Sequence, residues 1–153
     1  MYLSDKGIKE LMARQSDPLK ISPYGEARLT PNGYDVSIEV VDKDGKVLAD
    51  KEYSIKPGEL IRVKSVETLE MPDGHIGFML LRSRFTRQGL LGLFGVIDSG
   101  FKGKILASIK NLSDMPIPIK LDEGVIHTVF ATMSSESEVP YGTAEKHHWQ
   151  NQK

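Results

Sequence analysis

Alternating hydrophobic and polar positions recur in short runs along most of the chain. In the run 34–40, Val36, Ile38 and Val40 fall on one face at every second position, as in a strand with one buried face. The run 76–81 is apolar throughout, which predicts burial on both faces. Together these patterns predict roughly nine or ten short strands. The ranges are 19–21, 34–40, 47–55, 60–69, 76–81, 90–97, 104–109, 117–121 and 125–133.

Turn signals separate these runs at intervals of about 8–12 residues, which is typical of sandwiches, jelly rolls and barrels. Asp44-Gly45 predicts a hairpin turn because glycine accepts a positive φ. Pro57-Gly58 and the segment 71–74 have the composition of further turns. We therefore expect an all-β fold with short connections.

A helical pattern is found only near the N-terminus, from Ser4 to about Arg14. Ser4 has the side chain of an N-cap, and Ile8, Leu11 and Met12 follow at spacings of three and four residues. Pro18 prevents a longer helix. One short N-terminal helix is predicted.

Composition narrows the function. The chain has 153 residues, a length that fits a single domain spanning 1–153, and its net charge of −1 argues against a nucleic-acid partner. The absence of cysteine removes disulfides and thiolate catalysis. No apolar run reaches the about 18 residues of a membrane helix, and the N-terminus lacks signal-peptide features, so we expect a cytoplasmic protein.

Three arginines and a serine directly follow the apolar run 76–81, in the segment Arg82-Ser83-Arg84-Phe85-Thr86-Arg87. Guanidinium groups match phosphate oxygens in geometry and charge, and a serine hydroxyl adds a donor. A phosphate-binding loop and a solvated basic edge both explain this composition, and the residues alone do not separate them.

A second candidate segment is Gly95-Val96-Ile97-Asp98-Ser99-Gly100-Phe101-Lys102-Gly103. Asp98 comes at the end of an apolar strand, where it would serve as a general base, with Phe101 as a platform for a sugar or base. Taken alone, the pattern favours a hairpin in which Asp98 caps the turn. The segment Pro31-Asn32-Gly33-Tyr34-Asp35-Val36 and the four histidines are explained without any site.

The polar segment 134–153 carries Tyr141 and Trp149 as its aromatic residues. It is interpreted either as a frayed terminus or as a flexible tail that closes over a ligand. Composition alone favours the first interpretation.

Taken together, the segments resemble the dCTP deaminase and trimeric dUTPase superfamily, most closely the archaeal-type dUTPases of the dCTP deaminase family. Five motifs carry the resemblance in chain order and span almost the whole sequence. They are Met1–Ile8, Pro31–Val36, Arg82-Ser83 with Arg87, Gly95–Gly103, and Pro140-Tyr141 with Gln152.

This resemblance implies a distorted jelly-roll subunit of the dUTPase-like β-clip type. It also implies a homotrimer with sites at subunit interfaces, and Mg²⁺ bound to the substrate's triphosphate without a direct protein ligand. Asp98 would deprotonate the attacking water, and Phe101 would stack under the deoxyribose. The implied base and sugar contacts are Val96 and Ile97, and the implied phosphate and nucleotide contacts are Arg82, Ser83, Arg84, Arg87, Ser108, Tyr141 and Gln152.

One position separates the two reactions of the superfamily. The deaminases have a glutamate ten residues after the motif aspartate, and in this chain that position is Ser108. A serine cannot shuttle protons around a pyrimidine ring as a carboxylate does. We therefore expect a dUTP diphosphatase that converts dUTP to dUMP and pyrophosphate.

Several alternatives stay open at this point. A dCTP deaminase, alone or bifunctional, would need another group in place of the glutamate. A non-catalytic nucleotide-binding homologue is a second alternative. The motifs also depart from the family pattern, because Phe101 replaces a tyrosine, and His148 and Trp149 stand where deaminases have lysine and tyrosine.

Overall fold

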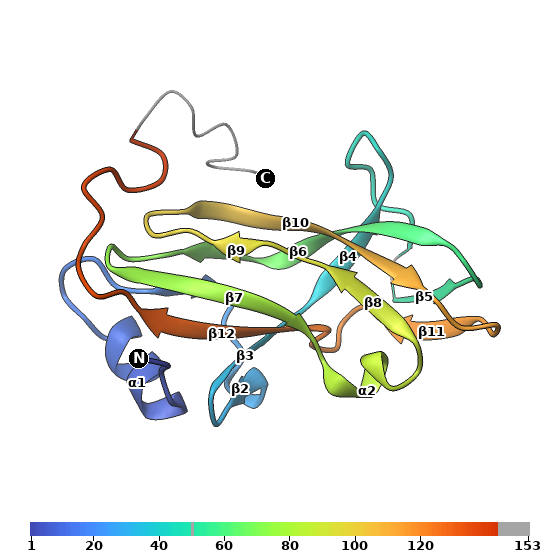
Figure 1. Ribbon diagram of the computed structural model, residues 1–153, viewed down its shortest axis with the longest axis horizontal. Helices are drawn as coiled ribbons and strands as arrows, with labels where there is room; N and C mark the ends of the chain where they lie inside the picture. The colour runs from blue at the N-terminus through green and yellow to red at the C-terminus, as the bar shows by residue number, and fades with distance from the viewer. Residues whose placement is uncertain (50, 144–153) are drawn as a thin grey trace.

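Strands dominate the computed structural model, which describes residues 1–49 and 51–143 (Figure 1). The helical elements are α1 (Asp5–Met12), η1 (Glu26–Arg28) and α2 (Ser83–Thr86). The strands are β1 (Lys20–Ser22), β2 (Leu29–Thr30), β3 (Gly33–Val36), β4 (Ile38–Val41), β5 (Glu52–Ile55), β6 (Leu60–Glu70), β7 (His75–Leu81), β8 (Leu90–Leu93), β9 (Val96–Ile97), β10 (Lys102–Asn111), β11 (Ile117–Lys120) and β12 (Ile126–Thr132).

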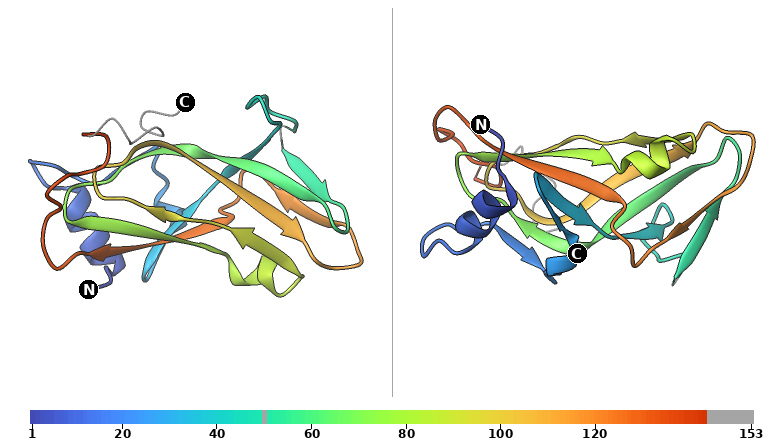
Figure 2. Two further views of the ribbon diagram at one scale, coloured as in Figure 1. Left: turned by 45° about the horizontal axis from the view of Figure 1, so that its top comes forward. Right: turned by 90° about the horizontal axis from the view of Figure 1, so that it is seen from below.

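Two five-stranded sheets organise the described residues (Figures 1 and 2). One has the order β2-β3-β12-β7-β9, and the other has the order β1-β6-β10-β8 with β4 also paired to β6. A small sheet of β5 and β11 continues the structure at one end. The predicted all-β, distorted jelly-roll fold with a short N-terminal helix is confirmed.

Helix α1 begins where the sequence predicts. The Ser4 hydroxyl accepts a hydrogen bond from the Gly7 backbone N–H at 3.2 Å, which satisfies one of the free donors of the first turn. Ile8 and Leu11 are buried against the sheets. Among the described residues, neither helix has the length and apolar composition needed to cross a membrane.

One buried cluster joins both large sheets, with Tyr34, Phe130, Leu69 and Ile109 among its fully buried side chains. Tyr34 and Phe130 come from β3 and β12, whereas Leu69 and Ile109 come from β6 and β10. Burial of such side chains contributes about 1.5–3 kcal/mol each. The sheets are therefore held together by side chains that alternate along each strand.

Two predicted strands are each divided between the two sheets. The run 34–40 forms β3 and β4, which pair with β12 and β6 respectively and are separated at Ser37. The run 90–97 forms β8 and β9, which pair with β10 and β7. In both cases a continuous period-2 pattern hides the point where the chain leaves one sheet for the other.

Two further expectations are corrected. The run 47–55 does not return as a full hairpin partner of β4, because only Val47 bridges to Val41 and β5 pairs with β11 instead. Strand β7 is not buried on both faces within one chain, since Leu80 is 52% exposed. The second point leaves an apolar side chain of β7 exposed in the described part of the structure.

Candidate active site

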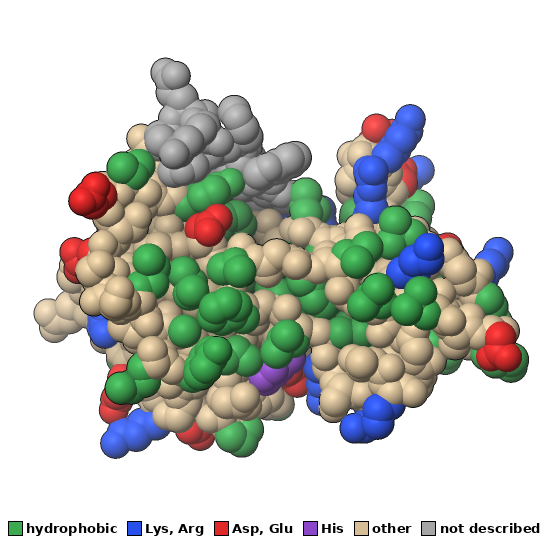
Figure 3. All heavy atoms as spheres, in the orientation of Figure 1, with side chains coloured by type: hydrophobic (Ala, Val, Ile, Leu, Met, Phe, Trp, Pro, Cys, Tyr) green, Lys and Arg blue, Asp and Glu red, His purple; other side chains and the backbone are tan. Residues whose placement is uncertain are grey.

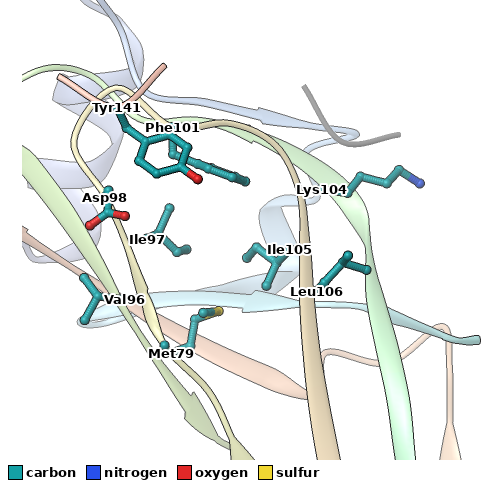
Figure 4. A pocket seen from close by; sticks show the side chains of 10 residues that line it. Met79, Val96, Ile97, Asp98, Phe101, Lys104, Ile105, Leu106 and Tyr141 are labelled. Carbon is teal, nitrogen blue, oxygen red and sulfur yellow. The ribbon is translucent and has the colours of Figure 1, made fainter. Parts of the chain in front are cut away.

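A pocket of about 340 Å³ opens between β9 and the first half of β10 (Figure 4). The pocket opens because the run 90–97 is divided between two sheets. Strand β8 pairs with β10 only from Ser108 onward, and β9 pairs with β7. The β10 backbone from 104 to 107 therefore has no strand partner on that side within the described residues. The lining residues are Met79, Gly95, Val96, Ile97, Asp98, Phe101, Lys104, Ile105, Leu106 and Tyr141.

Asp98 lies at the rim of this pocket, directly after β9 (Figure 4). The turn that follows is closed by the backbone, with the Phe101 N–H donating to the Asp98 carbonyl at 3.1 Å. The Asp98 side chain is exposed, and no donor within residues 1–49 and 51–143 bonds to its carboxylate. The structure therefore leaves this carboxylate accessible to water instead of using it as a turn cap.

Two aromatic rings form one wall of the pocket. The centroids of Phe101 and Tyr141 are 5.9 Å apart, with the ring planes at 55°. The Tyr141 N–H donates to the Ser99 carbonyl at 2.8 Å, which fixes the segment around Tyr141 on the turn after β9. The predicted tail thus reaches the pocket at Tyr141, whereas Gln152 lies outside the described residues.

Arg82 and Ser83 lie at a second hollow, of about 350 Å³, at the C-terminal end of β7. The Arg82 Nε forms an ion pair with the Asp35 carboxylate at 3.1 Å, and its Nη1 donates a hydrogen bond to the Gly124 carbonyl at 3.0 Å. These two contacts orient the guanidinium at the hollow. Ser83 is exposed beside it.

Arg84 and Arg87 have different surroundings. Arg84 forms an ion pair with Glu123, and its guanidinium carbon lies 4.4 Å from the centre of the Phe85 ring. Hydrogen bonding to Arg84 lowers the pKa of the Glu123 carboxyl below its ordinary value of 4.5. These contacts favour a role for Arg84 in holding the 82–87 turn, in contrast to its predicted role on phosphate. Arg87 is exposed at the end of α2.

Asp98 and Arg82 are far apart within one chain. Asp98 directly follows Ile97, which pairs with Gly77, so Asp98 is level with Ile76, whereas Arg82 directly follows the last residue of β7. At about 3.3 Å per residue, the six steps from Ile76 to Arg82 separate these two residues by about 20 Å. The structure does not bring Asp98 and the arginine segment together in a single chain.

Exposed hydrophobic side chains lie on the neighbouring strands β7, β8, β9 and β10. Figure 3 shows hydrophobic side chains gathered where these strands lie in Figure 1. We call the following five residues the apolar face; each is 43–52% exposed: Leu80, Leu91, Leu93, Val96 and Leu106. Such a surface on β7–β10 is typical of a protein–protein interface.

Ser108 lies on β10 outside the pocket lining, opposite Leu93 of β8 and Arg62 of β6. The next cross-strand pairs on the same face are Lys110 with Leu60 and with Leu91. Among the described residues, these cross-strand neighbours of Ser108 have no carboxylate.

Sequence reasoning missed two residues of the arginine hollow. Asp35 and His127 face each other across β3 and β12, and the His127 Nδ1 lies 2.8 Å from an Asp35 carboxylate oxygen. A turn-then-strand pattern explained Asp35 completely, and His127 occupies an ordinary strand position. Their contact joins segments 92 residues apart, so no local signal marks it.

Within residues 1–49 and 51–143, no group of three or more acidic or histidine side chains is placed to hold a metal ion. Mg²⁺ retains waters and takes phosphate oxygens as ligands readily. Each of the two hollows contributes one acidic side chain, Asp98 or Asp35.

Comparison with known proteins places this geometry in a family. The family model described as dCTP deaminase-like matches residues 38–133. A dCTP deaminase of Pyrococcus horikoshii is 32% identical over 131 residues, which cover 79% of this chain and 80% of that protein. A probable deoxyuridine 5'-triphosphate nucleotidohydrolase of Sulfolobus islandicus rod-shaped virus 1 is 33% identical over 146 residues, covering 92% and 90%.

Solved structures agree at the level of the fold. The dUTPase of Staphylococcus bacteriophage 80alpha with dUpNHpp has a TM-score of 0.56 and 17% sequence identity, and the match covers 85% of this chain and 91% of that one. The sheets, the family model and the relatives lead to one conclusion: the chain belongs to the dCTP deaminase-like family, which joins dCTP deaminases and dUTPases.

Proposed function

We propose that the protein is a dUTP diphosphatase, which hydrolyses dUTP to dUMP and pyrophosphate. One observation carries the choice between the two activities of the family. A water-accessible carboxylate, Asp98, is present at the pocket, whereas the residues paired with Ser108 on the two neighbouring strands, Arg62 and Leu93, have no carboxylate for deamination. Hydrolysis at a phosphorus atom needs one carboxylate to orient water, and deamination needs proton transfers at the ring as well.

The pocket between β9 and β10 suits a pyrimidine nucleoside. The free backbone edge of β10 offers N–H and C=O groups, which can pair with the polar edge of a base. Phe101 supplies an apolar surface for the deoxyribose, and Tyr141 closes the same side. The Phe101 ring against C2′ of the sugar would disfavour a ribonucleotide, because its 2′-hydroxyl would lose its hydrogen bonds to water.

The reaction is a single displacement. The Asp98 carboxylate accepts a proton from a water molecule as the water oxygen attacks the α-phosphorus. The bond from the α-phosphorus to the bridging oxygen breaks, and the electron pair leaves with pyrophosphate. The proton on Asp98 then passes to solvent.

Arg82, Ser83 and Arg87 would hold the triphosphate oxygens during this step. Arg82 is already oriented by Asp35 and the Gly124 carbonyl, so its guanidinium needs little reorganisation when phosphate binds. Mg²⁺ bound to the triphosphate would offset part of its negative charge. A dUTPase of phage phi11 of S. aureus has a described structural Mg(II) ion, which is consistent with this cofactor.

The separation of the hollows implies that the site is completed by another copy of the chain. Asp98 of one subunit would meet Arg82 of a neighbour across the apolar face, as expected for the predicted homotrimer. Deamination of dCTP is the second candidate function, and the names of several relatives favour it.

The experiment offers dUTP and dCTP separately, with Mg²⁺, and measures pyrophosphate and ammonia. We expect pyrophosphate from dUTP and no ammonia from dCTP. Asp98→Asn should lower kcat for dUTP by about a hundredfold or more, because the amide cannot accept the proton. Asp114→Asn is the matched control, since Asp114 is exposed in a loop away from both hollows, and its kcat should equal that of the wild type.

Two results would reject the proposal. Release of ammonia from dCTP as the main reaction would assign deamination. Unchanged dUTP turnover in Asp98→Asn would remove Asp98 from the chemistry.

A further inference from the structure

A three-residue polar cluster underlies the arginine hollow. The side chain of Asp35 is 8% exposed. One of its oxygens forms an ion pair with Arg82 Nε, and the other is hydrogen-bonded to His127 Nδ1. Arg82 and His127 both line the hollow, together with Ser83. A nearly buried carboxylate thus holds two cationic or ionisable groups side by side at one cavity.

The packing keeps this cluster in one arrangement. A Cβ atom at Gly124 would lie 2.4 Å from the Asp35 Cβ, and a Cβ at Gly33 would lie 2.9 Å from both Cε1 and Nε2 of His127. Either contact is shorter than real Cβ atoms show, so both glycines allow the close approach. The backbone at Gly33 and Gly124 thus packs directly against His127 and Asp35.

The protonation state of His127 determines what the hollow offers a ligand. Because an ionised carboxylate only accepts, Nδ1 of His127 carries a proton, and Nε2 is the remaining polar atom of the ring. Among the described residues Nε2 has no hydrogen-bond partner, and it is not one of the fully buried unpartnered atoms. A neutral ring presents a lone pair there, whereas an imidazolium presents an N–H donor with positive charge.

We propose that His127 is a protonation-dependent phosphate-binding residue beside Arg82. Binding of the triphosphate takes up one proton from solvent onto Nε2, which then donates to a phosphate oxygen while Nδ1 stays bonded to Asp35. The inference rests on the proposed function, because it assigns the hollow to a nucleotide triphosphate. It adds to that function a dependence of substrate affinity on pH.

The charged groups around His127 are compatible with this role. Asp35 faces it from β3 with a carboxylate, and Arg82, directly after β7, brings a guanidinium to the same hollow. Thr30 of β2 and Leu80 of β7 line the same hollow without charge. Arg84 and Glu123 are paired with each other and do not line the hollow.

The test measures binding of the non-hydrolysable α,β-imido analogue of dUTP by calorimetry, with Mg²⁺, between about pH 6 and about pH 8. His127→Asn keeps an N–H donor for Asp35 and removes the titrating nitrogen. Between these two pH values, the Kd of the wild type should rise by a factor about five times larger than the factor for His127→Asn. His75→Asn is the matched control, because His75 lies in the same sheet with Nδ1 on the Asp73 carbonyl, and its pH dependence should equal the wild type.

Wild-type binding in two buffers with different heats of ionisation provides a second measurement that needs no variant. The difference in binding enthalpy between the two buffers is expected to show uptake of a proton. A phosphate that loses its own proton on binding would give a difference of the opposite sign. Equal pH dependence in His127→Asn and wild type, no proton uptake, or no binding of the analogue would each overturn the proposal. Because the ligand is not hydrolysed, a failure of the proposed reaction is recognised separately from a failure of this inference.

Discussion

At the scale of single residues, the carboxylates of the two hollows differ in their surroundings. Asp35 is nearly buried, forms an ion pair with Arg82 and is hydrogen-bonded to His127, whereas Asp98 is exposed and has no donor among the described residues. The lone pairs of Asp98 are therefore available to a water molecule. On the proposed function, Asp35 would position Arg82 and Asp98 would accept the proton.

The ion pair of Arg84 and Glu123 gives a prediction for stability. Hydrogen bonding to Arg84 lowers the pKa of Glu123, so the stabilisation is present above the unfolded value of 4.5 and is lost as pH falls through the lower folded value. At neutral pH, Glu123→Gln should lower the free energy of unfolding by less than about 1 kcal/mol, because both side chains are a third or more exposed.

Urea unfolding of the wild type and Glu123→Gln at neutral pH and at about pH 3 checks this expectation. The difference between the two proteins should shrink at the acidic pH. Glu138→Gln serves as the control, because Glu138 is exposed and no ion pair to it is seen in the described structure. Equal effects of the two substitutions at neutral pH would contradict a contribution from the Arg84 pair.

At the scale of elements, local pattern predicted strands well and their partners poorly. Strands β6 and β10 and helix α1 lie where periodicity and capping indicate. The runs 34–40 and 90–97 were each predicted as one strand, because a change of sheet leaves the period-2 pattern intact. At Ser37 the backbone N–H donates to the buried Glu67 carboxylate at 2.9 Å instead of to a strand, and nothing near Ser37 in sequence encodes that partner.

The candidate site shows the same limit. Its motif residues Asp98, Phe101 and Tyr141 were identified from sequence and meet at one pocket. The partners of Arg82 were not identified, because Asp35 and His127 come from separate segments and meet only through the pairing of β3 with β12. Residues that act through local turns are thus recognised from a sequence, and residues that act through strand register need a structure.

The turn after β9 predicts that one methyl group added at Gly100 will move the segment around Tyr141. Gly100 has φ +81°, and a Cβ there would lie 3.0 Å from Pro140 Cβ and from the backbone N and O of Tyr141. Gly100→Ala should therefore displace Tyr141 from the pocket and raise KM for dUTP about tenfold or more. Gly45→Ala is a matched control, because Gly45 has φ +82° but nothing within 4 Å of the added atom.

Both substitutions impose a similar backbone cost of about 1–2 kcal/mol, since both glycines adopt the left-handed conformation. Thermal unfolding and steady-state kinetics on the two variants separate strain from displacement. Only Gly100→Ala should change KM. A KM in Gly100→Ala equal to that in Gly45→Ala would show that the docked segment does not contribute to substrate binding.

At the scale of the whole molecule, the proposed site would draw on two chains. Asp98 and Arg82 lie near opposite ends of β7, and β7–β10 carry the apolar face. Association through this face would bury exposed leucines and bring the arginine hollow of one subunit toward the pocket of another. On the proposed function, the same surface would therefore serve both assembly and catalysis.

Complementation between two inactive variants tests this arrangement. Asp98→Asn subunits retain the arginine hollow, and Arg82→Ala subunits retain the carboxylate. If each site takes Asp98 from one subunit and Arg82 from its neighbour, random mixing in equal amounts should give intact sites at about a quarter of positions. We therefore expect two nearly inactive proteins to recover about a quarter of wild-type dUTP turnover after they are unfolded together and refolded.

Each variant refolded alone is the control, and light scattering verifies that the mixed and single samples have the same oligomeric mass. Recovery would require that the reacting groups come from different chains. Mixed oligomers of normal mass without recovered turnover would reject the shared site. Asp98 and Arg82 would then have to act within one subunit, where about 20 Å along β7 separates them.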